Sequence, residues 1–250
     1  MDLPSDVRAI GALADPVRCE LYEFVASRAE PVGREAAAAA VGISTHQAKF
    51  HLERLVDAGL LDTEFRRLGG RTGPGAGRPA KLYRRAPGEF RVSLPDRRYD
   101  LAGGILASAI ELGAAGAPLD EAIAEAAYSA GEAAGAATAE AAASGSAAAA
   151  SGSEAGAAGR AAAVLATAGY EPELAAADPE AAEASIVRLR NCPFDRLARE
   201  HTDLICGANR HFVQGMLDGS GCDGSRAELD PRSGYCCVSA RVAEASPAEE

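Results

Sequence analysis

The sequence predicts a mainly α-helical protein with small β elements, organised as an N-terminal domain, a helical middle region and a cysteine-rich C-terminal module. Three observations predict this class. Apolar residues recur at helical spacing through the first part of the chain, and two short strand-like segments follow them. The middle of the chain is helical and rich in alanine and glycine. Five of the six cysteines fall in the last quarter, among short helix and strand patterns.

Charge is distributed unevenly along the 250 residues, whose formal net charge is −11. Residues 1–100 carry 16 Lys and Arg against 14 Asp and Glu, whereas residues 101–250 carry 9 against 22. Within residues 64–98 the balance is 10 basic to 3 acidic. A basic strip in an acidic protein favours a surface that faces phosphates, and an ordinary solvated surface is the alternative.

The sequence predicts no membrane segment. No run of roughly 18 residues has the Leu, Ile, Val and Phe content of a membrane span. The first residues, MDLPSDVRAIGALADP, lack the cationic and apolar regions of a signal peptide. We therefore expect a cytoplasmic protein. In that reducing compartment, six cysteines favour metal ligands or redox groups over structural disulfides.

The first sixty residues hold four helical patterns. Residues 5–28 contain two, and Asp15 followed by Pro16 is a typical start for the second. Residues 33–41 form a short helix that is almost all alanine. The fourth pattern, residues 42–61, opens with a capping box in which Ser takes the cap and Gln follows three residues later.

The fourth helix has an apolar stripe of Ala48, Leu52, Leu55 and Val56. Phe50 falls nearly opposite that stripe, so its ring needs another partner. A second subunit, a folded-back hairpin and a thymine methyl group are the candidates. The side chains away from the centre of the stripe are Thr45, His46, Lys49, Phe50 and Arg54.

Two strands are predicted at residues 60–68 and 80–86. Five glycines and two prolines in the connecting segment exclude regular structure there. That loop carries Arg71 and Arg78, and its length is typical of a functional or disordered segment.

These patterns resemble the winged helix-turn-helix domain of the ArsR-like regulators. The matching segments are LADPVRCELYEFV, FHLERLVDAGLL and GRPAKLY, within a domain that we place at residues 1–96. The resemblance implies that the helix after the turn enters the major groove of double-stranded DNA, while the wing follows the backbone or minor groove. A winged helix used for protein contacts is the alternative. The candidate DNA-binding residues are Ser44, Thr45, His46, Gln47, Lys49, Phe50, Arg54, Arg71 and Arg78.

Residues 97–168 form the helical middle region. Residues 97–116 predict a helix with an apolar stripe, which in a dimeric regulator packs against its twin, so we expect a homodimer. A second helix starts at Leu119. Residues 143–157 are alanine, glycine and serine with few exceptions, which predicts a flexible linker before a helix resumes to about residue 168.

The C-terminal module, residues 169–245, places two cysteines on either side of a helical pattern. If one helix ran from Cys192 to Cys206, the two residues would lie about 21 Å apart. Thr202 is a good cap for a second helix, and Pro193 suits the first position of a helix capped by Cys192. We therefore predict a break at residues 201–203 that brings both cysteines together.

The remaining cysteines lie in the tail. Cys222 occupies a glycine-rich loop, and Cys236 and Cys237 begin a strand-like segment. Adjacent residues of a strand point to opposite sides of the sheet. We therefore expect one of the two to face the site, while the other packs elsewhere or stays free.

The NCPF segment, a cysteine on the following helix and a late cysteine pair resemble the SufR-like iron–sulfur transcriptional regulators. The resemblance implies an iron–sulfur cluster, with [4Fe–4S] favoured and [2Fe–2S] as the other form. Cys192 and Cys206 fit the family pattern best, Cys222 departs from its spacing, and His201 is a candidate substitute ligand. The candidate metal ligands are Cys192, Cys206, Cys222, Cys236 and Cys237.

The residues alone leave other ligation chemistries open. Thiolate-rich ligation also suits zinc, although the wide spacing argues mildly against a zinc ribbon. A thiol–disulfide switch and inert buried thiols are the remaining alternatives.

We therefore expect a DNA-binding transcriptional regulator, acting as a repressor, whose operator binding is controlled by a cluster that senses cluster status or oxidative or nitrosative stress. The alternative is a zinc-stabilised or thiol-redox-responsive repressor without a cluster. An enzyme is not expected, since the sequence offers no nucleophile–base pair. The glycine-rich GGRTGPGAG segment lacks the lysine and helix of a phosphate-binding loop.

Overall fold

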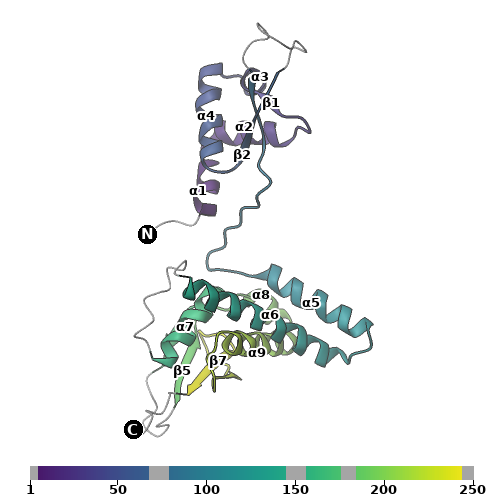
Figure 1. Ribbon diagram of the computed structural model, residues 1–250, viewed down its shortest axis with the longest axis vertical. Coiled ribbons are helices and arrows are strands. Elements are labelled where there is room, and N and C mark those ends of the chain that lie inside the picture. Colours follow the sequence, from purple (N-terminus) through teal and green to yellow (C-terminus); the bar gives the residue numbers. More distant parts are fainter. Residues whose placement is uncertain (1–4, 68–78, 145–155, 176–183, 244–250) are drawn as a thin grey trace. The chain divides into compact units, whose positions relative to one another are not determined.

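A computed structural model of the chain describes residues 5–67, 79–144, 156–175 and 184–243. The chain divides into two compact units, residues 1–92 and 93–250 (Figure 1). The helical middle region belongs to the same compact unit as the cysteine-rich module. Among the described residues, no helix combines the length and apolar content that crossing a membrane requires.

The N-terminal unit consists of four helices and a small antiparallel sheet with the strand order β1-β3-β2. Leu21, Leu52, Leu55 and Tyr83 are fully buried in its core. The elements are α1 (Ser5–Ala12), α2 (Pro16–Ala26), β1 (Val32–Gly33), α3 (Arg34–Val41), α4 (Thr45–Asp57), β2 (Leu61–Arg66) and β3 (Ala80–Arg85).

Local hydrogen bonds explain where the helices of this unit begin. The Asp15 carboxylate accepts a 3.0 Å hydrogen bond from the backbone N–H of Arg18 and caps α2. At the start of α4, the Ser44 hydroxyl accepts from the Gln47 N–H, and the Gln47 side chain accepts from the Ser44 N–H. Gly42, with φ of 74°, makes the left-handed turn between α3 and α4. The two caps predicted for this unit, Asp15 and Ser44, are confirmed.

The C-terminal unit places helices against a four-stranded antiparallel sheet with the order β4-β5-β7-β6 (Figure 1). Its elements are α5 (Tyr99–Ala114), α6 (Leu119–Ala143), α7 (Ala157–Thr167), β4 (Pro172–Leu174), β5 (Ala184–Leu189), α8 (Asp195–Glu200), α9 (Thr202–Gly219), β6 (Arg226–Leu229) and β7 (Val238–Ala243).

Helices α6 and α9 approach each other closely because glycines face the partner backbone on both sides. A methyl group added at Gly131 or Gly135 of α6 would collide with the backbone carbonyls of Phe212 or Met216. Gly215 of α9 meets the α6 backbone in the same way. Helix α6 ends at Ala143, where the sequence predicts that the linker begins. Most of the predicted linker lies outside the described residues.

Candidate functional site

The predicted break between the two cysteine-bearing helices is present. Helix α8 ends at Glu200, His201 has φ −137° and ψ 57°, and α9 begins at Thr202. The predicted cap was wrong, because the Thr202 hydroxyl donates a 2.8 Å hydrogen bond back to the Ala198 carbonyl. Because this bond occupies the Thr202 hydroxyl, the hydroxyl does not cap α9. The chain changes direction at the His201 backbone.

The start of α8 also differs from the prediction. The helix begins at Asp195, so Cys192 lies before the cap residue, Phe194. The Cys192 carbonyl accepts a 3.1 Å hydrogen bond from the Asp195 N–H. Cys192 therefore belongs to the loop that leads into the helix.

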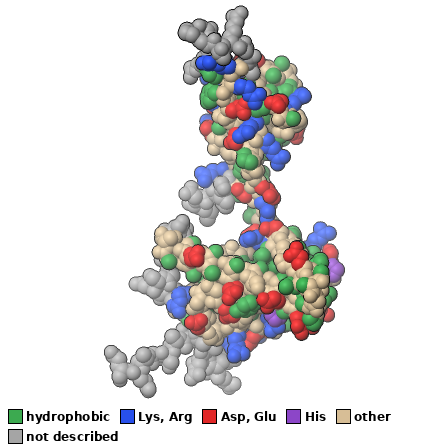
Figure 2. Space-filling view, turned by 45° about the vertical axis from the view of Figure 1, so that its right-hand side comes forward, with side chains coloured by type: hydrophobic (Ala, Val, Ile, Leu, Met, Phe, Trp, Pro, Cys, Tyr) green, Lys and Arg blue, Asp and Glu red, His purple; other side chains and the backbone are tan. Residues whose placement is uncertain are grey.

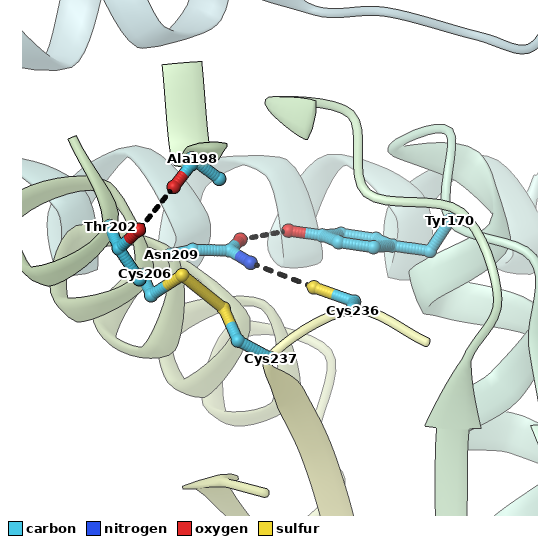
Figure 3. The surroundings of a disulfide bond; sticks show 7 residues. All are labelled: Tyr170, Ala198, Thr202, Cys206, Asn209, Cys236 and Cys237. Atoms are coloured by element: carbon cyan, nitrogen blue, oxygen red, sulfur yellow. Dashed lines mark hydrogen bonds between the residues drawn. A yellow bond between two sulfur atoms is a disulfide. The ribbon is translucent and has the colours of Figure 1, made fainter. Parts of the chain in front are cut away.

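Four of the five predicted ligand residues lie together, and we call Cys192, Cys206, Cys236 and Cys237 the cysteine centre. Cys206 and Cys237 form a disulfide with 6.3 Å between their Cα atoms (Figure 3). The side chains of Cys192 and Cys236 are hydrogen-bonded to each other. The centre thus contains one disulfide and one thiol pair.

The two adjacent cysteines both contribute to the centre, contrary to the expectation that only one would. Strand β7 begins at Val238, immediately after the pair. Cys236 and Cys237 therefore precede the strand, and the alternation of side chains along a strand does not apply to them.

A buried hydrogen-bond chain holds the Cys236 sulfur. The Tyr170 hydroxyl donates to the Asn209 side-chain oxygen, and the Asn209 side-chain nitrogen donates to the Cys236 sulfur at 3.3 Å (Figure 3). Asn209 was not among the site residues predicted from the sequence. The sequence feature that could have identified it is a single amide on the apolar face of α9, among Ile205, Ala208, Phe212 and Val213.

The two thiols of the pair differ in acidity. The hydrogen bond from Cys192 lowers the pKa of Cys236, and further donors, including Asn209, add to this effect against the opposing effect of burial. The same hydrogen bond, together with burial, raises the pKa of Cys192. Burial also raises the pKa of Tyr170. Of these two thiols, Cys236 is therefore the one that more readily carries negative charge.

A cavity of about 390 Å³ opens beside the thiol pair. Its lining includes Cys192, Cys236, Asn191, Arg97 and Arg190. Small reagents from solvent can therefore reach this side of the centre.

Cys222 is not brought into the centre. It lies just beyond the C-terminal end of α9, whereas Cys206 lies near the N-terminal end. The 13 residues from Cys206 to the end of the helix span about 20 Å. The Cys222 sulfur accepts a 3.4 Å hydrogen bond from the Ser220 hydroxyl. His201, the predicted substitute ligand, is exposed.

The thiolate donors of the centre suit a cluster as well as a single zinc ion. No three His, Cys, Asp or Glu side chains in the described part of the chain are arranged to hold one metal ion. One zinc ion would need its sulfurs within about 3.8 Å of each other, given bonds of about 2.3 Å. In a [4Fe–4S] cluster each of four thiolates binds a different iron atom, whereas in a [2Fe–2S] cluster two thiolates share each iron. The all-thiolate donor set of the centre fits a cluster once the disulfide is reduced.

The cysteine-bearing loop is hydrogen-bonded to the segment that precedes α5. The Arg97 guanidinium contacts the Asn191 side-chain oxygen and donates a 3.2 Å hydrogen bond to the Cys192 carbonyl. Asn191 donates in turn to the Asp96 carbonyl at 2.9 Å, and the Arg98 N–H donates to the Pro193 carbonyl. The start of α5 and the Cys192 loop therefore form one hydrogen-bonded assembly.

The outer face of α4 in the N-terminal unit is open to solvent. The stripe of Ala48, Leu52 and Leu55 is fully buried. The predicted DNA-binding residues of this helix region are all exposed, namely Ser44, Thr45, His46, Gln47, Lys49, Phe50 and Arg54. Figure 2 shows Lys and Arg side chains, with acidic ones among them, on the face of this unit that it presents.

An ion pair joins α4 to the hairpin strand β3. The Glu53 carboxylate accepts 2.7 Å hydrogen bonds from the Lys81 ammonium and from the Tyr83 hydroxyl. Burial acts to raise the pKa of Glu53, but the two donors outweigh it and the pKa is lowered. Burial, reinforced by Glu53, raises the pKa of Tyr83. The negative charge of Glu53, in the middle of α4, is thus paired with the positive charge of Lys81 in β3.

Residues 13–64 match the family model of a helix-turn-helix domain. The match runs from the end of α1 to within β2, and it covers both α3 and α4. The helix-turn-helix domain supports a DNA-binding transcriptional regulator. Neither the comparison with curated proteins nor the comparison with solved structures found a match.

In the helix-turn-helix domain, α4 is the second helix, and its open face is the DNA-facing candidate. Ser44 and Gln47 bond to each other in the capping box, so part of their polar capacity is already used. Arg71 and Arg78 lie outside the described residues.

Proposed function

We propose that the chain is a DNA-binding repressor whose operator affinity is set by the state of the cysteine centre. The observation that carries this proposal is the meeting of four cysteines from three separate segments in a chain that also has a helix-turn-helix domain. Cytosolic cysteines held together in this way are typical of metal-binding or redox sites.

The centre is proposed to hold an iron–sulfur cluster, ligated by Cys192, Cys206, Cys236 and Cys237. Four thiolates complete the ligation of a [4Fe–4S] or [2Fe–2S] cluster without Cys222 or a histidine. A bound cluster would supply a reversible electron acceptor that oxidants and nitric oxide can destroy. The protein would contribute the ligands and the hydrogen bond from Asn209 to the Cys236 sulfur.

A thiol–disulfide switch is the second candidate, favoured by the Cys206–Cys237 disulfide. Its formation from two thiols releases two electrons and two protons to an oxidant, and a reducing thiol reverses it. Both candidates place the sensing chemistry at the same residues.

The dimer interface is proposed to involve the exposed apolar side chains around α5. Among the apolar residues of α5, Leu101 and Ile105 pack within the chain, whereas Ile110 is 66% exposed and Leu112 is 37% exposed. Leu119, at the start of α6, is 62% exposed. A second copy of the chain would cover these side chains.

Anaerobic purification tests the cluster. The proposal predicts a coloured protein that contains iron and acid-labile sulfide, and loss of both should change its affinity for an operator duplex. Colourless protein that contains zinc would refute the cluster and support a zinc-stabilised repressor. Iron-free, zinc-free protein whose operator affinity follows the thiol–disulfide ratio would support the second candidate.

A further inference from the structure

We propose that Phe50 determines part of the operator sequence by packing its ring against the C5-methyl group of a thymine in the major groove. This inference rests on the DNA-binding part of the proposed function. It concerns base recognition and is independent of the chemistry of the cysteine centre.

Phe50 is an apolar side chain on the face of α4 that points away from the core. Its side chain is 53% exposed, whereas Leu52 and Leu55 are fully buried on the opposite face. A phenylalanine exposed to water forgoes the stabilisation that burial of its ring would give. On the helix that would enter the major groove, bound DNA is the partner that would cover the ring.

The ring is held by neighbours on its own helix. The Arg54 guanidinium lies 5.5 Å from the centre of the Phe50 ring, within the range of a cation–π contact. The His51 ring packs edge-on against it, with centroids 5.3 Å apart and planes at 77°. Because these contacts restrict the ring before binding, little side-chain entropy remains to be lost on contact with a base.

The charges around Phe50 fit a polyanion. Lys49 and Arg54 are exposed beside it. Glu53 lies between them along the helix, but Lys81 and Tyr83 satisfy its carboxylate. Asp57, the other acidic residue near this face, is the last residue of α4.

The chemistry of the major groove then identifies the base. Its floor is lined by hydrogen-bond donors and acceptors, and the thymine C5-methyl is the apolar group that a phenylalanine contacts there. Hydrogen-bonding residues such as Thr45, His46 and Lys49 can read the polar edges, but none of them has the large, wholly apolar ring of phenylalanine. Phe50 thus supplies the apolar part of the readout.

Selection from a random duplex library with the full chain, followed by single dT-to-dU replacements, tests the proposal. Deoxyuridine lacks only the C5-methyl group. At one thymine of the selected site, wild-type affinity should fall about fourfold, the value of one buried methyl-sized group. The Phe50→Ala variant should bind the dT and dU duplexes equally at that position. Phe65→Ala is the matched control, since Phe65 is also an exposed phenylalanine of this domain, and it should retain the fourfold loss.

Three results would overturn the inference. The wild type and Phe50→Ala could show the same dU penalty at every thymine. Phe50→Ala could leave operator affinity unchanged while weakening dimerisation or a protein contact, which would assign the ring to a protein partner. Failure to enrich any sequence would remove the DNA-binding function itself and this inference with it, a result distinct from the first two.

Discussion

The guanidinium of Arg97 donates a 3.2 Å hydrogen bond to the backbone carbonyl of Cys192. Arg97 lies two residues before α5, in the segment that follows the helix-turn-helix unit, and Cys192 belongs to the cysteine centre. Under the proposed function, a change in the geometry of Cys192 would therefore reach Arg97, which follows the helix-turn-helix unit in the sequence. We regard this contact as the proposed route from the cysteine centre to DNA.

Replacement of Arg97 by alanine should uncouple DNA binding from the cysteine centre. Allosteric coupling of about 1–3 kcal/mol corresponds to roughly a 5- to 150-fold change in affinity between states. In Arg97→Ala that ratio should fall below about twofold, because the charged donor to the Cys192 loop is lost. Operator titrations of both states of each protein measure the ratio.

Arg98→Ala is the control for this experiment. It removes the same charge one residue later, but within the described part of the chain the ion-pair partner of the Arg98 side chain is Asp100, at 3.9 Å. The control should keep the wild-type ratio. Equal loss of coupling in both variants would show that charge in this segment, and not the contact with Cys192, carries the effect.

Serine replacement of single cysteines should separate Cys222 from the centre. Cys222→Ser should retain iron close to the wild-type stoichiometry, since Cys222 lies at the far end of α9 from Cys206. Serine at residue 192, 206, 236 or 237 should reduce the iron content strongly. Iron and sulfide analysis after anaerobic reconstitution gives the result, and loss of iron in Cys222→Ser alone would contradict the arrangement of the centre.

The link between Glu53 and Lys81 should give the helix-turn-helix unit a pH-dependent stability. Because the pKa of Glu53 is lowered from its ordinary value of 4.5, its contribution exists above that value and disappears as the pH falls through the lowered pKa. The pair is about one-third exposed, so Glu53→Gln should cost no more than about 1 kcal/mol at neutral pH. Urea unfolding from neutral pH to about pH 3 should show wild type and variant converging in acid. A difference that stays constant with pH would exclude the charge as its source.

The packing of α6 on α9 should make Gly131 intolerant of a side chain. Gly131→Ala places a methyl group against the Phe212 carbonyl, and overpacking of this kind costs about 1–3 kcal/mol of unfolding free energy. Gly103→Ala, in α5, meets nothing within 4 Å and should stabilise by about 0.5–1 kcal/mol, because alanine is the better helix former. Urea unfolding compares the two variants, and equal stability would mean that the helices are not in close contact in solution.

Features that depend on neighbouring residues could be predicted from the sequence. The caps at Asp15 and Ser44 involve partners within three residues, and both are present. The break at residues 201–203 was predicted in the right place, yet the chemistry at Thr202 differs because its hydroxyl has a competing acceptor on the preceding turn.

Features that depend on distant residues could not be predicted. Gly131 and Gly135 lie in an alanine-rich helix, and their packing role depends on a helix some eighty residues later. Cys222 lies outside the cysteine centre because the length of α9 separates it from Cys206. Asn209 has a role only because Tyr170 and Cys236 meet it in the folded unit.

The central claim is that the state of the cysteine centre sets operator affinity, and one titration tests it most directly. The full chain, reduced and iron-loaded under anaerobic conditions, is compared with the same preparation after removal of iron and oxidation, on one selected duplex across a salt series. The two states should differ in operator affinity at least about fivefold at every salt concentration, and the difference should be abolished in Arg97→Ala. Equal affinities of the two states across the whole series would contradict it.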